Sequence, residues 1–143
     1  MQHTFSHDDL QFDYFVDDFT DPWANAPALL MIHAAMGNAT RWNPWVPSLC
    51  RRYRVIRPDL RGHGRTQIPG PENELTLAKL AGDMVALLDH LGIERAHVVG
   101  NSAGGYVGQH LAMLHPERVR TLALFGSAPG LKNSQAARWL PKV

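Results

Sequence analysis

The sequence has few of the features of membrane-spanning, secreted or disulfide-rich proteins. Cys50 is the only cysteine among 143 residues, which excludes an intrachain disulfide and a thiolate zinc site. No apolar run approaches the roughly 18 residues that a membrane span needs. The first 21 residues are acidic, unlike a secretory signal or a basic transit peptide. We therefore expect a cytoplasmic protein with Cys50 packed as a buried thiol.

The sequence also lacks a strong net charge. The formal net charge is +1, which favours neither nucleic acid nor a membrane as a partner, and 45% hydrophobic residues indicate a globular domain. The charges are unevenly placed, because residues 1–21 carry six Asp and no Lys or Arg, whereas residues 41–65 carry seven Arg and one Asp. We interpret the two segments as solvated surfaces that can face each other, with an anionic-ligand patch as the alternative.

Hydrophobic patterning predicts strands that alternate with helices. We expect a hairpin over 4–19 that turns near His7–Asp9, strands over 28–32, 53–56, 96–99 and 119–125, helices over 42–50, 76–90 and 102–115, and a further helix within 133–140. Such alternation indicates a mostly parallel sheet with right-handed crossovers. Ligands of these sheets bind beyond the carboxyl ends of the strands. His33, Asp59 and Ser102 follow three predicted strands, so we expect the site there.

The segment Gly100-Asn101-Ser102-Ala103-Gly104 matches the nucleophile motif G-x-S-x-G. Glycines two positions to either side of the serine allow the strand and the following helix to approach closely. The sharp turn exposes the hydroxyl at a positively polarised helix N-terminus. We therefore predict that Ser102 is a catalytic nucleophile. The alternative is a purely structural role, in which the glycine-rich turn only allows close packing.

Two backbone donors are expected to form an oxyanion hole beside the serine. One is the N–H of Ala103, and the second is the N–H of Ala35, in the loop that leaves the strand over 28–32. Candidate substrate-binding residues are His33, Met36 and Tyr106. For His33, bracing of this loop is the alternative, and for Met36 and Tyr106 it is core packing. Asp59 and His63 are expected to stabilise a turn, with a substrate contact as the alternative. No histidine pair has metal-ligand spacing, so we predict no metal and no cofactor.

These motifs together resemble the α/β-hydrolase superfamily, particularly esterases, lactonases and C–C hydrolases that carry a lid. The matching stretches are 29–33, 55–64, 98–105 and 115–119. The resemblance implies an α/β-hydrolase fold, with about six of its eight strands present, an N-terminal part of the core over 1–130 and the beginning of a lid over 131–143. It also implies that Ser102 is the nucleophile, with Ala35 and Ala103 as the oxyanion hole. One departure is Ala34, where the family usually has glycine.

The acid and the histidine that should follow the nucleophile are missing. After Ser102 the sequence has no Asp, its only acid is Glu117, and its histidines are His110 and His115 on the helix that the serine begins. Eight residues of helix rise about 12 Å, so even His110 lies too far along the helix to reach the hydroxyl. We therefore expect a fragment, or one chain of a split or cleaved protein, whose second segment supplies the last strands, the acid and the histidine.

The resulting hypothesis is a serine hydrolase of a small carboxylic ester or lactone, acting through an acyl-enzyme on Ser102. The alternatives are a C–C bond hydrolase or another superfamily member, and a non-catalytic binding or structural half of a split protein. The expected partners are a small-molecule substrate and the second segment or chain. The completed protein could form a homo-oligomer.

Overall fold

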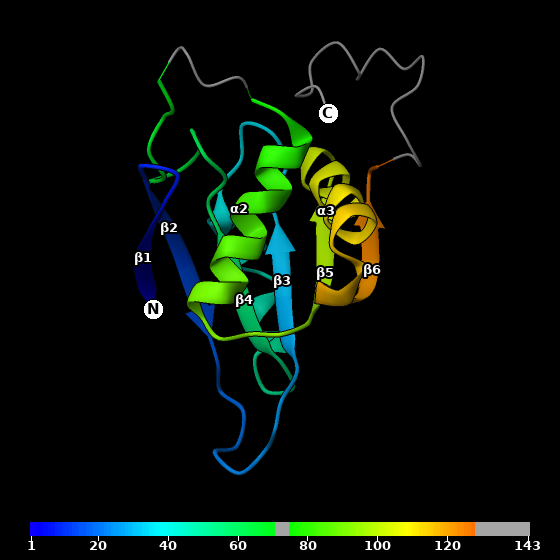
Figure 1. The fold of residues 1–143 in the computed structure, drawn as a ribbon. Helices are drawn as coiled ribbons and strands as arrows, with labels where there is room; N and C mark the ends of the chain where they lie inside the picture. The colour runs from blue at the N-terminus through cyan, green and yellow to red at the C-terminus, as the bar shows by residue number, and fades with distance from the viewer. Residues whose placement is uncertain (71–74, 128–143) are drawn as a thin grey trace.

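The computed structural model of the chain describes residues 1–70 and 75–127. Strands and helices alternate after an N-terminal hairpin (Figure 1). In chain order the elements are β1 Gln2–His7, β2 Leu10–Asp17, β3 Ala28–Ile32, the 3₁₀ helix η1 Ala39–Trp42, α1 Val46–Leu49, β4 Arg54–Pro58, α2 Leu77–His90, β5 Ala96–Asn101, α3 Ala103–Leu114, the 3₁₀ helix η2 Pro116–Arg118 and β6 Val119–Phe125. The lid predicted over 131–143 and the helix predicted within 133–140 lie outside the described residues.

The six strands form one sheet in the order β1-β2-β4-β3-β5-β6. The hairpin is antiparallel and joins the sheet through β2, whereas β3 runs parallel to β4 and β5, and β5 runs parallel to β6. The predicted N-terminal hairpin followed by a mostly parallel sheet is therefore confirmed. Because β4, β3 and β5 are neighbours, their carboxyl ends bring together the residues that follow them, which are Asp59, His33 and Ser102.

The sequence of α2 contains an N-cap, an apolar stripe and a terminating glycine, which together explain why it forms a helix. Thr76 has an extended backbone and its side chain accepts a hydrogen bond from the Lys79 N–H at 3.1 Å, as expected of an N-cap. Five large apolar residues recur at helical spacing and are buried against the sheet: Leu77, Leu80, Met84, Leu87 and Leu88. Burying each such side chain stabilises the fold by about 1.5–3 kcal/mol. Gly92, with a φ of +66°, allows the chain to leave the helix.

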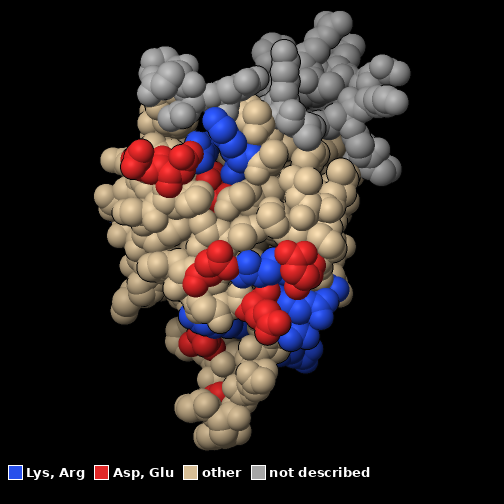
Figure 2. All heavy atoms as spheres, viewed as in Figure 1, with Lys and Arg blue, Asp and Glu red and all other residues tan. Residues whose placement is uncertain are grey.

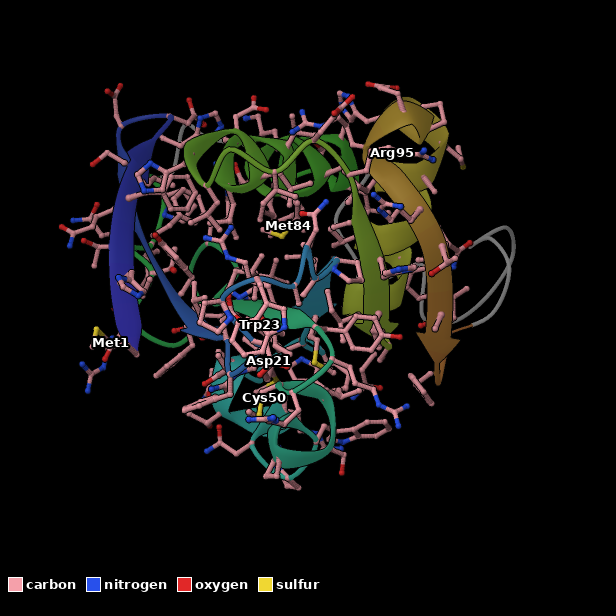
Figure 3. All side chains as sticks on the ribbon, turned by 90° about the horizontal axis from the view of Figure 1, so that it is seen from below. Met1, Asp21, Trp23, Cys50, Met84 and Arg95 are labelled. Carbon is pink, nitrogen blue, oxygen red and sulfur yellow. The ribbon has the colours of Figure 1, made fainter. Side chains whose placement is uncertain are left out.

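The two faces of the sheet are covered to different extents. Helices α2 and α3 lie over one face, and α1, which Cys50 directly follows, lies on the other (Figure 3). Beneath α1 a small core contains Leu29, Met31, Trp42, Cys50 and Val55, and the buried thiol confirms the prediction for Cys50. The same face carries an apolar groove of about 240 Å³ over β3, β5 and β6, whose lining includes Val99, Ala123 and Phe125.

The acidic N-terminal segment and the arginine-rich segment face each other, as predicted. Asp17 pairs with Arg57 at 2.7 Å and Asp8 pairs with Arg61 at 3.1 Å. Figure 2 shows acidic and basic side chains gathered in the same parts of one face of the molecule. Arg61 also binds the buried carboxylate of Asp83 at 2.7 Å. Burial raises the pKa of Asp83, and the bonds from Arg61 oppose that rise.

Candidate active site

Ser102 lies in a sharp turn between β5 and α3, as predicted. Its φ of 53° and ψ of −114° place a residue with a Cβ in the left-handed half of backbone space. Such a conformation costs on the order of 1–3 kcal/mol and persists only where the surrounding structure enforces it. Ser102 is exposed, and its hydroxyl has no hydrogen-bond partner within residues 1–70 and 75–127.

Close backbone contacts enforce the turn and explain the two glycines of the motif. A Cβ on Gly104 would overlap the carbonyl oxygens of Ile32 and His33, so the start of α3 presses against the end of β3. A Cβ on Gly100 would overlap the carbonyl group of Gly104. The glycines therefore let the strand, the helix and the loop after β3 meet around Ser102, as the motif predicts.

Residues at and just after the end of β6 also hold the turn. The Ser102 N–H donates to the Phe125 carbonyl oxygen at 2.8 Å, and the Ser127 hydroxyl donates to the Ser102 carbonyl oxygen at 2.8 Å. Both backbone polar groups of Ser102 are thus bound by residues more than twenty positions away. Sequence reasoning did not single out Ser127, because a serine after a strand gives no signal of which backbone atom it binds.

The predicted oxyanion donors line one cavity. Ala103 is the first residue of α3, so its N–H has no intrahelical acceptor, and the N–H of Ala35 has no acceptor within the described part of the chain. Ala35 and Ala103 both border a mostly apolar cavity of about 210 Å³. Met36, a predicted substrate contact, borders the same cavity and has a φ of +61°. Tyr106, another predicted contact, lies instead in the main hydrophobic core, 7% exposed.

His33 braces the loop that carries Ala35. The ring is fully buried, its Nδ1–H donates to the Ala34 carbonyl oxygen at 2.7 Å, and its Nε2 accepts the Leu60 N–H at 3.0 Å. Because one nitrogen donates and the other accepts, the imidazole is neutral and held in one tautomer. Burial lowers the pKa of His33, although the bond to Ala34 opposes this effect. With both nitrogens bound to backbone, the geometry supports bracing over the predicted substrate contact.

Asp59 fixes the next loop and the start of η1. Its carboxylate accepts the Ala39 N–H at 2.7 Å and the Arg65 N–H at 3.1 Å, while the side chain is almost completely buried. The His63 ring lies 5.2 Å from the His33 ring, and its Nδ1 lies 3.1 Å from the Arg61 carbonyl oxygen. These bonds confirm the predicted turn pinned by Asp59 and His63. They join the loops after β3 and β4 into one support for the site.

No described side chain is hydrogen-bonded to the Ser102 hydroxyl, and the two histidines that follow Ser102 in the chain have other neighbours. The His110 Nδ1 lies 3.2 Å from the Tyr106 carbonyl oxygen on α3, and the His115 Nδ1 lies 4.0 Å from the Glu117 carboxylate at the far end of that helix. Within residues 1–70 and 75–127, no group of three or more His, Cys, Asp and Glu side chains could hold a metal ion. None of the described helices combines the length and apolarity required to cross a membrane.

The strand, the sharp turn and the helix around Ser102 form one compact unit, and comparison with known proteins places the chain in a family. The sequence model for the alpha/beta hydrolase fold matches residues 27–143, so the chain belongs to this family. It is 42% identical over 103 residues to 2-hydroxymuconate semialdehyde hydrolase of Pseudomonas sp. (strain CF600), covering 70% of this chain and 36% of that protein.

Two solved structures show the same fold. A hydrolase from Pseudomonas aeruginosa PA01 is 34% identical with a TM-score of 0.84, and the match covers 96% of this chain and 49% of that one. The enol-lactonase from Burkholderia xenovorans LB400 is 32% identical with a TM-score of 0.80, and the match covers 88% of this chain and 47% of that one. This chain therefore spans between about a third and a half of the length of these relatives.

Proposed function

We propose that the chain is the nucleophile-bearing part of a serine hydrolase that acts on a small carboxylic ester or lactone. The observation that carries the proposal is the backbone of Ser102, whose φ of 53° is held by close contacts on both sides. A strained, exposed serine at the start of a helix is placed to attack a carbonyl carbon. Serine hydrolases use this geometry on several kinds of acyl substrate, and the enol-lactonase among the structural relatives favours an ester or a lactone.

The proposed reaction uses the residues around the elbow in two steps. The Ser102 hydroxyl loses its proton to a histidine and its oxygen attacks the carbonyl carbon of the substrate. The negative charge that develops on the carbonyl oxygen is stabilised by the N–H groups of Ala35 and Ala103. The alcohol leaves with the proton from the histidine, and an attacking water then releases the acid and restores the serine.

A second segment is proposed to supply the histidine and the acid. Within the described residues β6 pairs with β5 alone, has no buried residue and exposes 43% of Phe125. Next to it lies the apolar groove over β3, β5 and β6. An uncovered edge of this kind favours pairing with another strand. A segment docked there would lie beside the bonds that Phe125, at the end of β6, and Ser127, two residues further on, make to Ser102. We also propose, separately, that the protein is cytoplasmic.

The test is hydrolysis of phenyl acetate by the full-length protein and by its Ser102→Ala variant. Removing a nucleophile of a triad lowers kcat by several orders of magnitude. Mass spectrometry of the acid-quenched reaction should detect an acetyl group on Ser102 of the wild-type protein. Equal turnover by the variant would refute the assignment, and a folded full-length protein without any turnover or acetylation would favour a binding half instead.

A further inference from the structure

A polar pocket opens at the end of the sheet opposite to Ser102. It has a volume of about 430 Å³, and its lining includes Asn25, Arg54, Glu94, Arg95, His97 and Arg120. These residues lie at the amino ends of the parallel strands, whereas Ser102 follows the carboxyl end of β5. Strand β5 has 6 residues, so about 20 Å separates the pocket from Ser102. Figure 3 looks onto this end of the sheet and labels Arg95.

Three arginines from three different parts of the chain meet in this pocket. Arg54 is the first residue of β4, Arg95 directly precedes β5, and Arg120 is the second residue of β6. Glu94 is the one carboxylate of the described lining, so three arginines and one glutamate leave a net charge of +2. A concave surface with an excess of positive charge raises the local concentration of anions.

The guanidinium groups of this pocket lack a neutralising partner. Within the described residues, Arg54 and Arg120 have no side-chain hydrogen bond or ion pair, and Arg95 reaches only one backbone carbonyl oxygen, at 3.5 Å. Arg118, which does not belong to the lining, is by contrast paired with Asp89 at 2.8 Å. Arg54 is also half-buried, so its charge loses hydration without gaining a carboxylate. A bound anion would offset this loss.

A β-bulge places Arg120 in the pocket. Ala96 of β5 pairs with Val119 of β6, and the next residue of β5, His97, pairs with Thr121. Arg120 is therefore an extra residue on β6. Bulges of this kind redirect a side chain and are over-represented next to active sites. The irregularity in the strand pairing thus coincides with the cluster of arginines and is independent of their charge.

We propose that this pocket binds a diphosphate group through Arg54, Arg95 and Arg120. Each guanidinium presents a planar fork of N–H donors that matches a pair of phosphate oxygens, and a diphosphate has enough terminal oxygens for three such forks. The volume lies within the range of about 300–1,000 Å³ that is typical of small-molecule pockets. The diphosphate can therefore be inorganic or belong to a small organic molecule. The proposed role of Ser102 does not enter this inference.

Isothermal titration of the full-length protein with pyrophosphate tests the proposal. It is carried out in about 0.1 M NaCl, where exposed charges more than about 10 Å away are largely screened. Orthophosphate is the comparison for a single phosphate group, and ADP is the comparison for a diphosphate on an organic carrier. The variants are Arg54→Gln, Arg120→Gln and Glu94→Gln. Arg52→Gln is the matched control, because it removes an exposed arginine outside the described lining.

We expect saturable binding of pyrophosphate and at least about tenfold weaker binding of orthophosphate. Arg54→Gln and Arg120→Gln should each weaken pyrophosphate binding by about five- to tenfold, as the loss of one charged hydrogen-bond donor predicts. Glu94→Gln should strengthen binding by about two- to threefold, because it removes the carboxylate of the lining. Arg52→Gln should change it by less than about twofold.

Arg120→Gln is the decisive variant, because Arg120 is exposed on the last strand of the described sheet and its replacement leaves the core intact. Tighter binding of ADP than of pyrophosphate would support the proposal with an organic carrier, and weaker binding of ADP would support it with inorganic pyrophosphate. Absence of saturable pyrophosphate binding, equal binding of orthophosphate, or an unchanged affinity in Arg120→Gln would each overturn the proposal.

Discussion

The Ser102 N–H donates to the Phe125 carbonyl oxygen at 2.8 Å, which attaches the turn at Ser102 to β6, the last strand of the described sheet. The Ser127 hydroxyl adds a second bond, to the Ser102 carbonyl oxygen. The turn therefore depends on a strand that pairs with the rest of the described sheet on one side only. A segment that paired with the open side of β6 would therefore also stabilise the backbone of Ser102.

Gly104→Ala should destabilise the fold by about 1–3 kcal/mol or more, because the added methyl group overlaps the carbonyl oxygens of Ile32 and His33. Gly82→Ala is the matched control, since Gly82 lies inside α2 and an added Cβ has no heavy atom within 4 Å. This control should gain about 0.5–1 kcal/mol from helix propensity. Urea unfolding of both variants measures the difference, and similar free energies would contradict the close approach at the elbow.

Ser102→Gly should raise the free energy of unfolding by about 1 kcal/mol, because glycine adopts a φ of 53° without the strain that a Cβ causes. Ser102→Ala keeps the Cβ and should remain within about 0.5 kcal/mol of the wild-type value. Both variants lack the hydroxyl, so any difference in stability between them reports on the backbone. Equal unfolding midpoints in urea would show that the turn stores no strain.

The buried His33 predicts a loss of stability on acidification. Its pKa is lower in the folded chain than in the unfolded chain, chiefly because of burial, so the unfolded chain binds more protons. Its contribution is complete above the unfolded value of about 6.5 and decreases as pH falls from there through the folded pKa. The free energy of unfolding, measured by urea titration between pH 7.5 and 5, should decrease accordingly.

His33→Gln should be less stable at pH 7.5, since one amide cannot reproduce both backbone bonds of the ring, and its stability should change less across this pH range. His3→Gln is the control, because His3 is an exposed residue of β1 outside the loops that His33 joins. The free energy of unfolding of His3→Gln should decrease on acidification as much as that of the wild-type protein. A His33→Gln variant with the same dependence on pH as the wild-type protein would contradict the assignment.

The sequence contains enough local information to predict most of the fold. The Thr76 N-cap, the stripe of leucines in α2 and the glycines around Ser102 are short-range patterns, and each structure that they predict is present. The helix expected over 42–50 is different, because the chain forms η1 over Ala39–Trp42 and α1 over Val46–Leu49 instead. Asn38 caps η1 by accepting the Thr40 N–H, so the first turn begins before the predicted start.

The support of the site could not be predicted in the same way. Asp59 binds the Ala39 N–H from 20 residues away, and Ser127 binds the Ser102 carbonyl oxygen from 25 residues away. Such pairs depend on strand order and register, which no local pattern encodes. For Tyr106 the sequence left a substrate contact and core packing open, and the structure places its side chain in the main hydrophobic core.

The most direct test of the account is labelling of the full-length protein with a fluorophosphonate probe, followed by peptide mapping. We expect a single labelled residue, Ser102, no labelling of Ser102→Ala, and retained labelling of Ser127→Ala, which loses only a hydrogen bond to the turn. Labelling at another serine, or equal labelling of Ser102→Ala, would contradict the claim that Ser102 is the nucleophile.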